Sequence, residues 1–134
     1  MATWQLCFSL IPCENCTFSD KNALNIKALS MLGKCLPINK GWCEDMMLFG
    51  DLNGTCVEMF FCNGVLDEVS VRLHVGRLSK QQVVGILDFA NMNDMQIYYE
   101  GKNICPSLQN IRGLISNSPA FKFVSNPQSF FENL

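Results

Sequence analysis

Hydrophobic and polar residues alternate along several stretches of the chain, which is the pattern of a β-strand with one buried face. In Thr3–Ile11 every second residue from Trp4 to Leu10 is apolar, and Pro12 ends the stretch because proline has no N–H for strand pairing. Similar patterns predict five further strands, at Met46–Phe49, Thr55–Cys62, Val65–Val75, Met95–Glu100 and Asn103–Cys105.

Asn63-Gly64 separates two of these strands, so Thr55–Val75 is predicted to form a β-hairpin. Two turn types are open for this hairpin, and each of them sets a different register. A two-residue Asn-Gly turn would place Glu58 beside Val69 and would therefore mix polar and apolar side chains on one face of the sheet.

A three-residue turn that ends with a left-handed Gly64 pairs Val57 with Val69 and separates the two faces better, so we favour this register. It also sets Glu58 opposite Glu68 on the outer face, where the two like charges repel each other. A nearby cation or a partner would offset this repulsion.

Apolar residues at helical spacing follow four capping signals and predict four helices. The first helix begins at Asp20 or Asn22 and runs to about Lys34, where Gly33 and Pro37 close it. The other three helices begin after the capping residues Ser79, Ser107 and Asn126. This order of strands and helices predicts a single α+β domain over residues 1–134, with helices packed on one face of a mainly antiparallel sheet.

Composition narrows the classes of partner that the protein could bind. Of the 134 residues 49% are apolar and 16% charged, and the net charge of −2 includes no run of Lys or Arg, which excludes a phosphate-binding surface for nucleic acid. No apolar run reaches the about 18 residues that span a bilayer, and no basic residue precedes the first apolar stretch as in a signal peptide. We therefore expect a cytoplasmic protein that binds neither nucleic acid nor membrane, with enough apolar surface to form a homodimer.

Cys13-Glu14-Asn15-Cys16 is the sharpest candidate for a chemical site among the eight cysteines. Such a Cys-x-x-Cys pair can be half of a zinc site, a redox pair, one end of a disulfide framework or two thiols that are neighbours in a loop. A reducing cytosol keeps thiols free, and no second Cys-x-x-Cys supplies the other two zinc ligands. We favour neighbouring thiols in a loop and expect no metal and no cofactor, with zinc or thiol chemistry at Cys13 and Cys16 as the alternative.

Catalysis by a cysteine or serine nucleophile would need a base, and His74 is the only histidine in the chain. It falls on the polar face of the predicted hairpin, between Arg72 and Gly76, where a histidine is usually a solvated strand residue. We therefore expect no catalytic residue and no enzymatic activity.

Carboxylates gather in the middle of the chain, on or beside the central strands. They form either an ordinary solvated face or a surface that docks on a basic partner and accelerates association. The six residues are Glu44, Asp45, Asp51, Glu58, Asp67 and Glu68.

From Phe49 onward the chain resembles small bacterial immunity proteins of polymorphic or type VI secreted toxin systems. Three segments carry this resemblance: EVSVRLHVGRLS, ILDFANMNDMQIYY and SNSPAFKFVSNPQSFFENL. The resemblance implies a non-enzymatic protein that binds a cognate toxin and occludes its active site. The expected contacts are the six carboxylates together with Trp42 and Phe49, because aromatic residues often anchor interfaces. A small ligand-binding protein or a thiol- or zinc-dependent module is the alternative.

Overall fold

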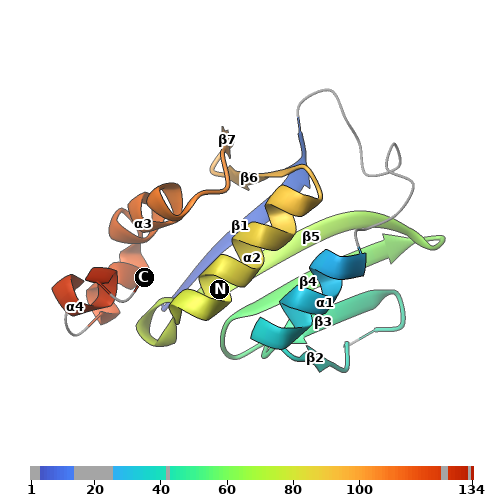
Figure 1. The fold of residues 1–134 in the computed structure, drawn as a ribbon, viewed down its shortest axis with the longest axis horizontal. Coiled ribbons are helices and arrows are strands. Elements are labelled where there is room, and N and C mark those ends of the chain that lie inside the picture. The colour runs from blue at the N-terminus through green and yellow to red at the C-terminus, as the bar shows by residue number, and fades with distance from the viewer. Residues whose placement is uncertain (1–3, 14–25, 42, 125–126, 133) are drawn as a thin grey trace.

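The computed structural model describes residues 4–13, 26–41, 43–124, 127–132 and 134, and in these residues seven strands form one antiparallel sheet (Figure 1). The strands are β1 (Gln5–Pro12), β2 (Ile38–Asn39), β3 (Met46–Gly50), β4 (Cys56–Cys62), β5 (Val65–His74), β6 (Met95–Tyr99) and β7 (Lys102–Ile104). They lie in the order β2-β3-β4-β5-β1-β6-β7, so β5 occupies the middle of the sheet.

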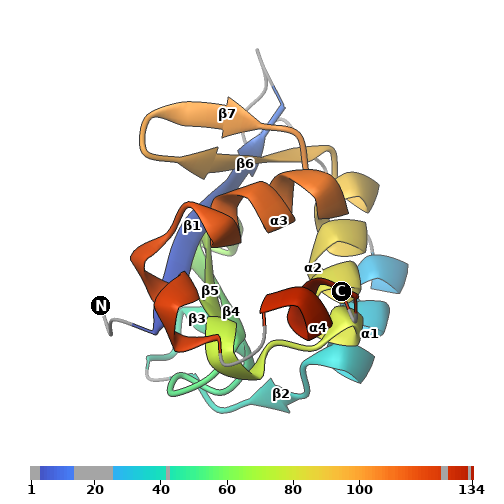
Figure 2. The same ribbon diagram turned by 90° about the vertical axis from the view of Figure 1, so that its left-hand side faces the viewer.

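Helices cover one face of this sheet. In the described residues they are α1 (Ile26–Cys35), α2 (Lys80–Met92), α3 (Leu108–Ser116) and α4 (Pro127–Glu132), with the short 3₁₀ helices η2 (Val75–Arg77) and η3 (Pro119–Phe123). Helices α1 and α2 lie side by side against the sheet, and α3 extends this layer toward β6 and β7 (Figures 1 and 2). The arrangement confirms the predicted α+β class and the predicted order of elements, to which the structure adds the two-residue strand β2.

The main core fills the space between the helices and the sheet. Alternate residues of β1 and β5, such as Leu10, Val69 and Val71, are almost fully buried in the same core cluster as Ile86 of α2. Burial of each such side chain contributes about 1.5–3 kcal/mol to folding. The period-two pattern in the sequence therefore identified the face of the sheet that the helices cover.

Trp4 is the exception in the first alternating stretch. The pattern placed it inward, but it precedes β1 and its side chain is 41% exposed. Its ring lies 6.0 Å from the ring of His74, measured between centroids. Alternation predicts the side of the backbone from which a side chain projects, and it does not predict how far the core extends along the strand.

The turn of the β4–β5 hairpin differs from the one we favoured. Cys62 pairs with Val65 across a two-residue turn, in which Asn63 and Gly64 have φ values of 52° and 79°. Two successive left-handed residues are typical of a type I′ turn, which suits the twist of a hairpin. The predicted three-residue turn is therefore wrong.

A β-bulge, and not the turn, places the polar and apolar side chains of the hairpin on separate faces. The register shifts after Phe61, so that Phe60 pairs with Glu68 and Asp67 is the extra residue in β5. Beyond the bulge Glu58 pairs with Ser70. The predicted pairing of Glu58 with Glu68 is therefore wrong as well, because the two-residue turn and the bulge each move β5 by one residue from the predicted register.

Local capping chemistry predicted the starts of two helices correctly. The Ser79 hydroxyl accepts a hydrogen bond from the Gln82 backbone N–H, and the Gln82 side chain accepts one from the Ser79 N–H, both at 3.2 Å. The Ser107 hydroxyl caps α3 in the same way. Helix α1 ends at Cys35, next to the predicted end at about Lys34. Its predicted caps Asp20 and Asn22 lie outside the described residues, as does Asn126.

Gly50 should be the least replaceable of the turn glycines. Its φ is +91°, and a Cβ built there would lie 2.3 Å from the Thr55 carbonyl oxygen, whereas one built at Gly64, with φ +79°, would meet nothing within 4 Å. We expect Gly64→Ala to lower the free energy of unfolding by about 1–2 kcal/mol and Gly50→Ala by about 3 kcal/mol or more, because the second adds a backbone clash to the left-handed strain. Urea denaturation measures both, and equal losses would contradict the role of the Thr55 carbonyl.

Candidate functional site

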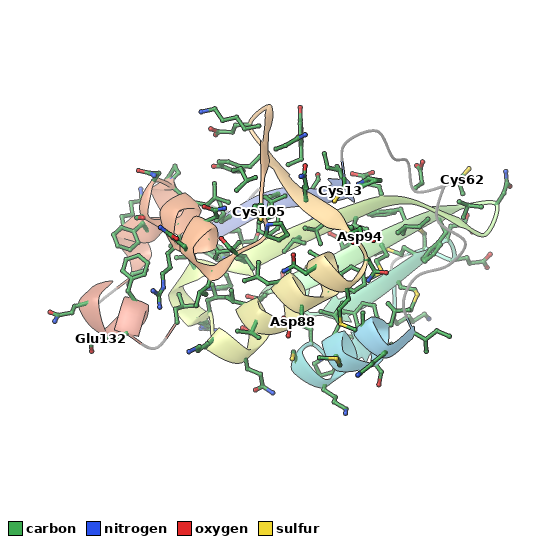
Figure 3. The ribbon with its side chains drawn as sticks, turned by 45° about the horizontal axis from the view of Figure 1, so that its top comes forward. Cys13, Cys62, Asp88, Asp94, Cys105 and Glu132 are labelled. Carbon is green, nitrogen blue, oxygen red and sulfur yellow. The ribbon has the colours of Figure 1, made fainter. Side chains whose placement is uncertain are left out.

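Four of the six predicted carboxylates lie at one end of the sheet. Glu44 and Asp45 precede β3, Asp67 and Glu68 lie in the first half of β5, and all four are exposed. These four residues are called the acidic hairpin surface below. Cys62 marks the tip of the hairpin beside them, at the end of the molecule opposite to Glu132 (Figure 3).

Backbone pairing brings these carboxylates together around the end of β4. The Asp45 carbonyl accepts a hydrogen bond of 2.8 Å from the Phe61 N–H on one side of β4. On the other side Phe60 pairs with Glu68. The bulge lets two successive residues of β5, Asp67 and Glu68, both stand out from the sheet. Strand pairing thus sets the positions of Asp67 and Glu68, and a hydrogen bond to β4 sets that of Asp45.

The charge of this region is unbalanced. Residues 43–71 contain six carboxylates and no Lys, Arg or His, whereas the rest of the chain contains six carboxylates and ten Lys or Arg. The net charge of −2 is therefore the sum of an acidic segment and a basic remainder. An exposed surface of one sign attracts the opposite sign over about 8–10 Å at physiological salt.

Glu58 belongs to the same segment but not to the exposed surface. Its side chain is 2% exposed and lies 3.1 Å from the guanidinium of Arg72, which stands two residues further along β5 than the Ser70 opposite Glu58. A buried carboxylate needs such a partner, because removal of a charge from water costs several kcal/mol. Glu58 does not face Glu68, and its own negative charge is offset by Arg72.

The remaining predicted contacts lie elsewhere. Phe49 is 0% exposed and belongs to the core, so its side chain offers no surface to a partner in this fold. Trp42 lies outside the described residues, as does Cys16. Asp51 follows β3 at its far end, five strand residues away from Asp45.

Asp51 lines a hollow of about 470 Å³ with His74, Arg77 and Cys35. The Asp51 carboxylate accepts a hydrogen bond from the Asn53 N–H, and the His74 N–H donates to the Thr55 hydroxyl. In the described part of the chain, no hydrogen bond joins the His74 imidazole to a thiol or a carboxylate. The pairing of nucleophile and base that covalent catalysis uses is therefore not formed between these side chains.

The thiols that the structure describes are free and lie in several different parts of the fold. The seven cysteines in the described ranges form no disulfide, and those ranges contain no group of three or more His, Cys, Asp or Glu residues that could hold a metal ion. Cys13 is half-buried, and its N–H donates to the Asp94 carbonyl at 3.0 Å. Burial, with the adjacent Glu58 carboxylate adding to the effect, raises the pKa of Cys56 to about 11, and burial also raises the pKa of Cys7.

No family model, curated protein or solved structure matches the chain. The resemblance to immunity proteins therefore stays a prediction. No helix in the part of the chain that the structure describes is both long and apolar enough to cross a bilayer.

The bulge and the Glu58–Arg72 pair are the features that sequence reasoning missed. A signal for the bulge was present, because the inward residues Leu66 and Val69 are three positions apart in a strand that otherwise alternates. A two-residue turn followed by a shift of one residue at that point pairs Glu58 with Ser70, as in the structure. No comparable local signal predicts that Glu58 is buried.

Arg72 should matter more to stability than an exposed arginine. We expect Arg72→Met to lower the free energy of unfolding by about 2–3 kcal/mol, because it leaves the buried Glu58 carboxylate without this cation; solvent access to Arg72 keeps the loss below that of a fully buried pair. Arg77→Met, at an exposed position, should change it by about 0.5 kcal/mol or less. Equal effects in urea denaturation would show that the ion pair contributes little.

Alkylation should distinguish the thiols. A thiol with a pKa of about 11 is only about one-thousandth ionised at pH 8, so iodoacetamide should modify Cys56 last and the exposed Cys43, Cys62 and Cys105 first. Peptide mass spectrometry over time measures the order, and in urea the difference should disappear. Early modification of Cys56 in the folded protein would contradict its burial.

Proposed function

We propose that the protein is a non-enzymatic inhibitor of the immunity type, which binds a cognate toxin through the acidic hairpin surface and covers the toxin's active site. The observation that carries this proposal is the cluster of four exposed carboxylates within a segment that has no positive side chain. A surface of this kind fits a cleft lined by Lys and Arg, such as those of enzymes that act on anionic substrates.

Apolar groups beside the carboxylates support binding as well as attraction. Val65 is 47% exposed, and Phe60 and Phe61 are half-buried at the same end of the hairpin. Charges increase the rate of association, but most of the free energy of tight complexes comes from anchors that become desolvated. A contact centred on Val65 and surrounded by carboxylates would combine the two contributions.

Preorganisation also favours this surface. Strand β4 is paired on both sides at Phe60, with Met46 of β3 and with Glu68 of β5, so the ladder orders the backbone before any partner arrives. A surface that is already ordered loses less conformational entropy on binding. Stoichiometric occlusion requires no catalytic group and no movement of the sheet.

The test is co-expression with the product of the neighbouring gene in the native genome. The protein should protect cells from that product and form a one-to-one complex with it. Asp67→Lys with Glu68→Lys should weaken the complex by about 100-fold and abolish protection, because two attractions become repulsions. The matched control is Asp88→Lys with Glu132→Lys, which makes the same change in charge away from the hairpin tip (Figure 3).

Two results would contradict the proposal. The first is a neighbouring product that is neither toxic nor bound. The second is an equal loss of affinity for the two double variants, which would mean that net charge matters and that the position of the carboxylates does not. Circular dichroism of each variant confirms that the fold is retained.

A further inference from the structure

Strand β1 has an edge that no other strand of the described sheet covers. It pairs with β5 from Gln5 to Leu10, but with β6 only from Ser9 onward. Strand β6 stops at Tyr99 because Glu100 and Gly101, with φ values of 48° and 79°, form a tight turn that leads into β7. The first half of β1 therefore has a strand neighbour on one side only.

The backbone groups that face this open side can be identified. The Trp4 carbonyl accepts a hydrogen bond from the Val75 N–H on the β5 side, and the Cys13 N–H donates to Asp94 on the β6 side. Since backbone groups alternate in direction along a strand, even-numbered residues of β1 bond toward β5 and odd-numbered residues toward β6. The N–H and C=O of Gln5 and of Cys7 thus point to the open side, where no described residue hydrogen-bonds them.

A cleft of about 410 Å³ runs along this edge. Its lining comes from residues 5–9 of β1, Ser70 of β5, Tyr98–Glu100 at the end of β6, and Ser118 and Pro119 at the start of η3. The volume lies toward the lower end of the about 300–1,000 Å³ of pockets that hold small ligands. Because Ser118 and Pro119 lie outside the sheet, the cleft offers an extended segment both the β1 edge and a second wall.

We propose that this cleft binds an extended peptide segment of a partner protein, which adds to β1 as an antiparallel strand in line with β6. The Gln5 and Cys7 backbones offer two donors and two acceptors in the spacing that a strand uses, and such pairing is a common mode of peptide recognition. Residues opposite Cys7 and Gln5 face the outer side of the sheet, as Tyr98 does opposite Ser9. The residue between them lies opposite Leu6 and faces the core side, so the segment is polar–apolar–polar.

This peptide site is separate from the acidic hairpin surface. Residues 5–8 of β1 pair with the last four residues of β5, whereas the carboxylates Asp67 and Glu68 lie in its first half. The proposal therefore does not depend on the toxin-binding function. A protein with both sites could engage two partners at once.

The probe is the peptide acetyl-Thr-Val-Thr-amide, titrated into the isotope-labelled protein and followed by NMR. Chemical-shift changes should be confined to residues 5–9, 98–100 and 118–119. In the free protein the amide hydrogens of Gln5 and Cys7 should exchange with solvent faster than those of Leu6 and Phe8. Peptide binding should protect the Gln5 and Cys7 amides from exchange. N-methylation of both threonines should weaken binding at least tenfold, because their N–H groups pair with β1. N-methylation of the valine, whose N–H points away from β1, is the matched control and should have little effect.

A second comparison changes the protein instead of the peptide. Cys7→Pro removes the N–H on the open side and leaves the bonds to β5 intact, and strands tolerate proline at such an edge position. This variant should abolish peptide binding, whereas the control Cys7→Ala should retain it. Absence of binding up to about 10 mM peptide would overturn the proposal, as would equal losses from the two N-methylated peptides. Protection of Gln5 and Cys7 that rises with protein concentration would overturn it in favour of a second copy as the occupant.

Discussion

The register of β5 is the constraint on which the rest of the structure depends. This strand pairs with β4 on one side and with β1 on the other, so its pattern of inward and outward residues is imposed on both neighbours. Val69, Val71 and Leu73 face the helices, and the residues opposite them in β4 and β1 must do the same. The bulge at Asp67 is therefore more than a local irregularity, because it sets the face on which each side chain of the hairpin tip lies.

The buried pair of Glu58 and Arg72 shows how that constraint acts on the outer face. Glu58 pairs with Leu48, which belongs to a second, smaller apolar cluster with Met46 and Cys56. A carboxylate there is stable only with a cation within reach, and the register places Arg72 at 3.1 Å. Burial and the same carboxylate raise the pKa of the Cys56 thiol to about 11, so this thiol stays protonated and unreactive near neutral pH.

Residues whose roles depend on near neighbours in the chain could be predicted from the sequence. Ser79 and Ser107 cap helices as expected, and the alternation in β1 and β5 identified the inward side chains. Burial of Phe49 and Glu58 could not be predicted, because it depends on what β3 and β4 pack against across the whole sheet. The acidic hairpin surface was predicted only in part: four residues converge, while Asp51 lies at the far end of β3 because strand direction separates residues that are close in sequence.

The position of β1 has a consequence for how the chain folds. This strand is made first among the seven, yet it lies between β5 and β6, and Leu6 pairs with Leu73, which is half of the chain away. During synthesis its apolar face has no partner until β5 has emerged from the ribosome, and contacts of such long range slow folding because loop closure comes before any gain from pairing. The nascent protein therefore exposes an aggregation-prone strand until β5 has emerged, and a chaperone that holds extended apolar segments would protect it during this interval.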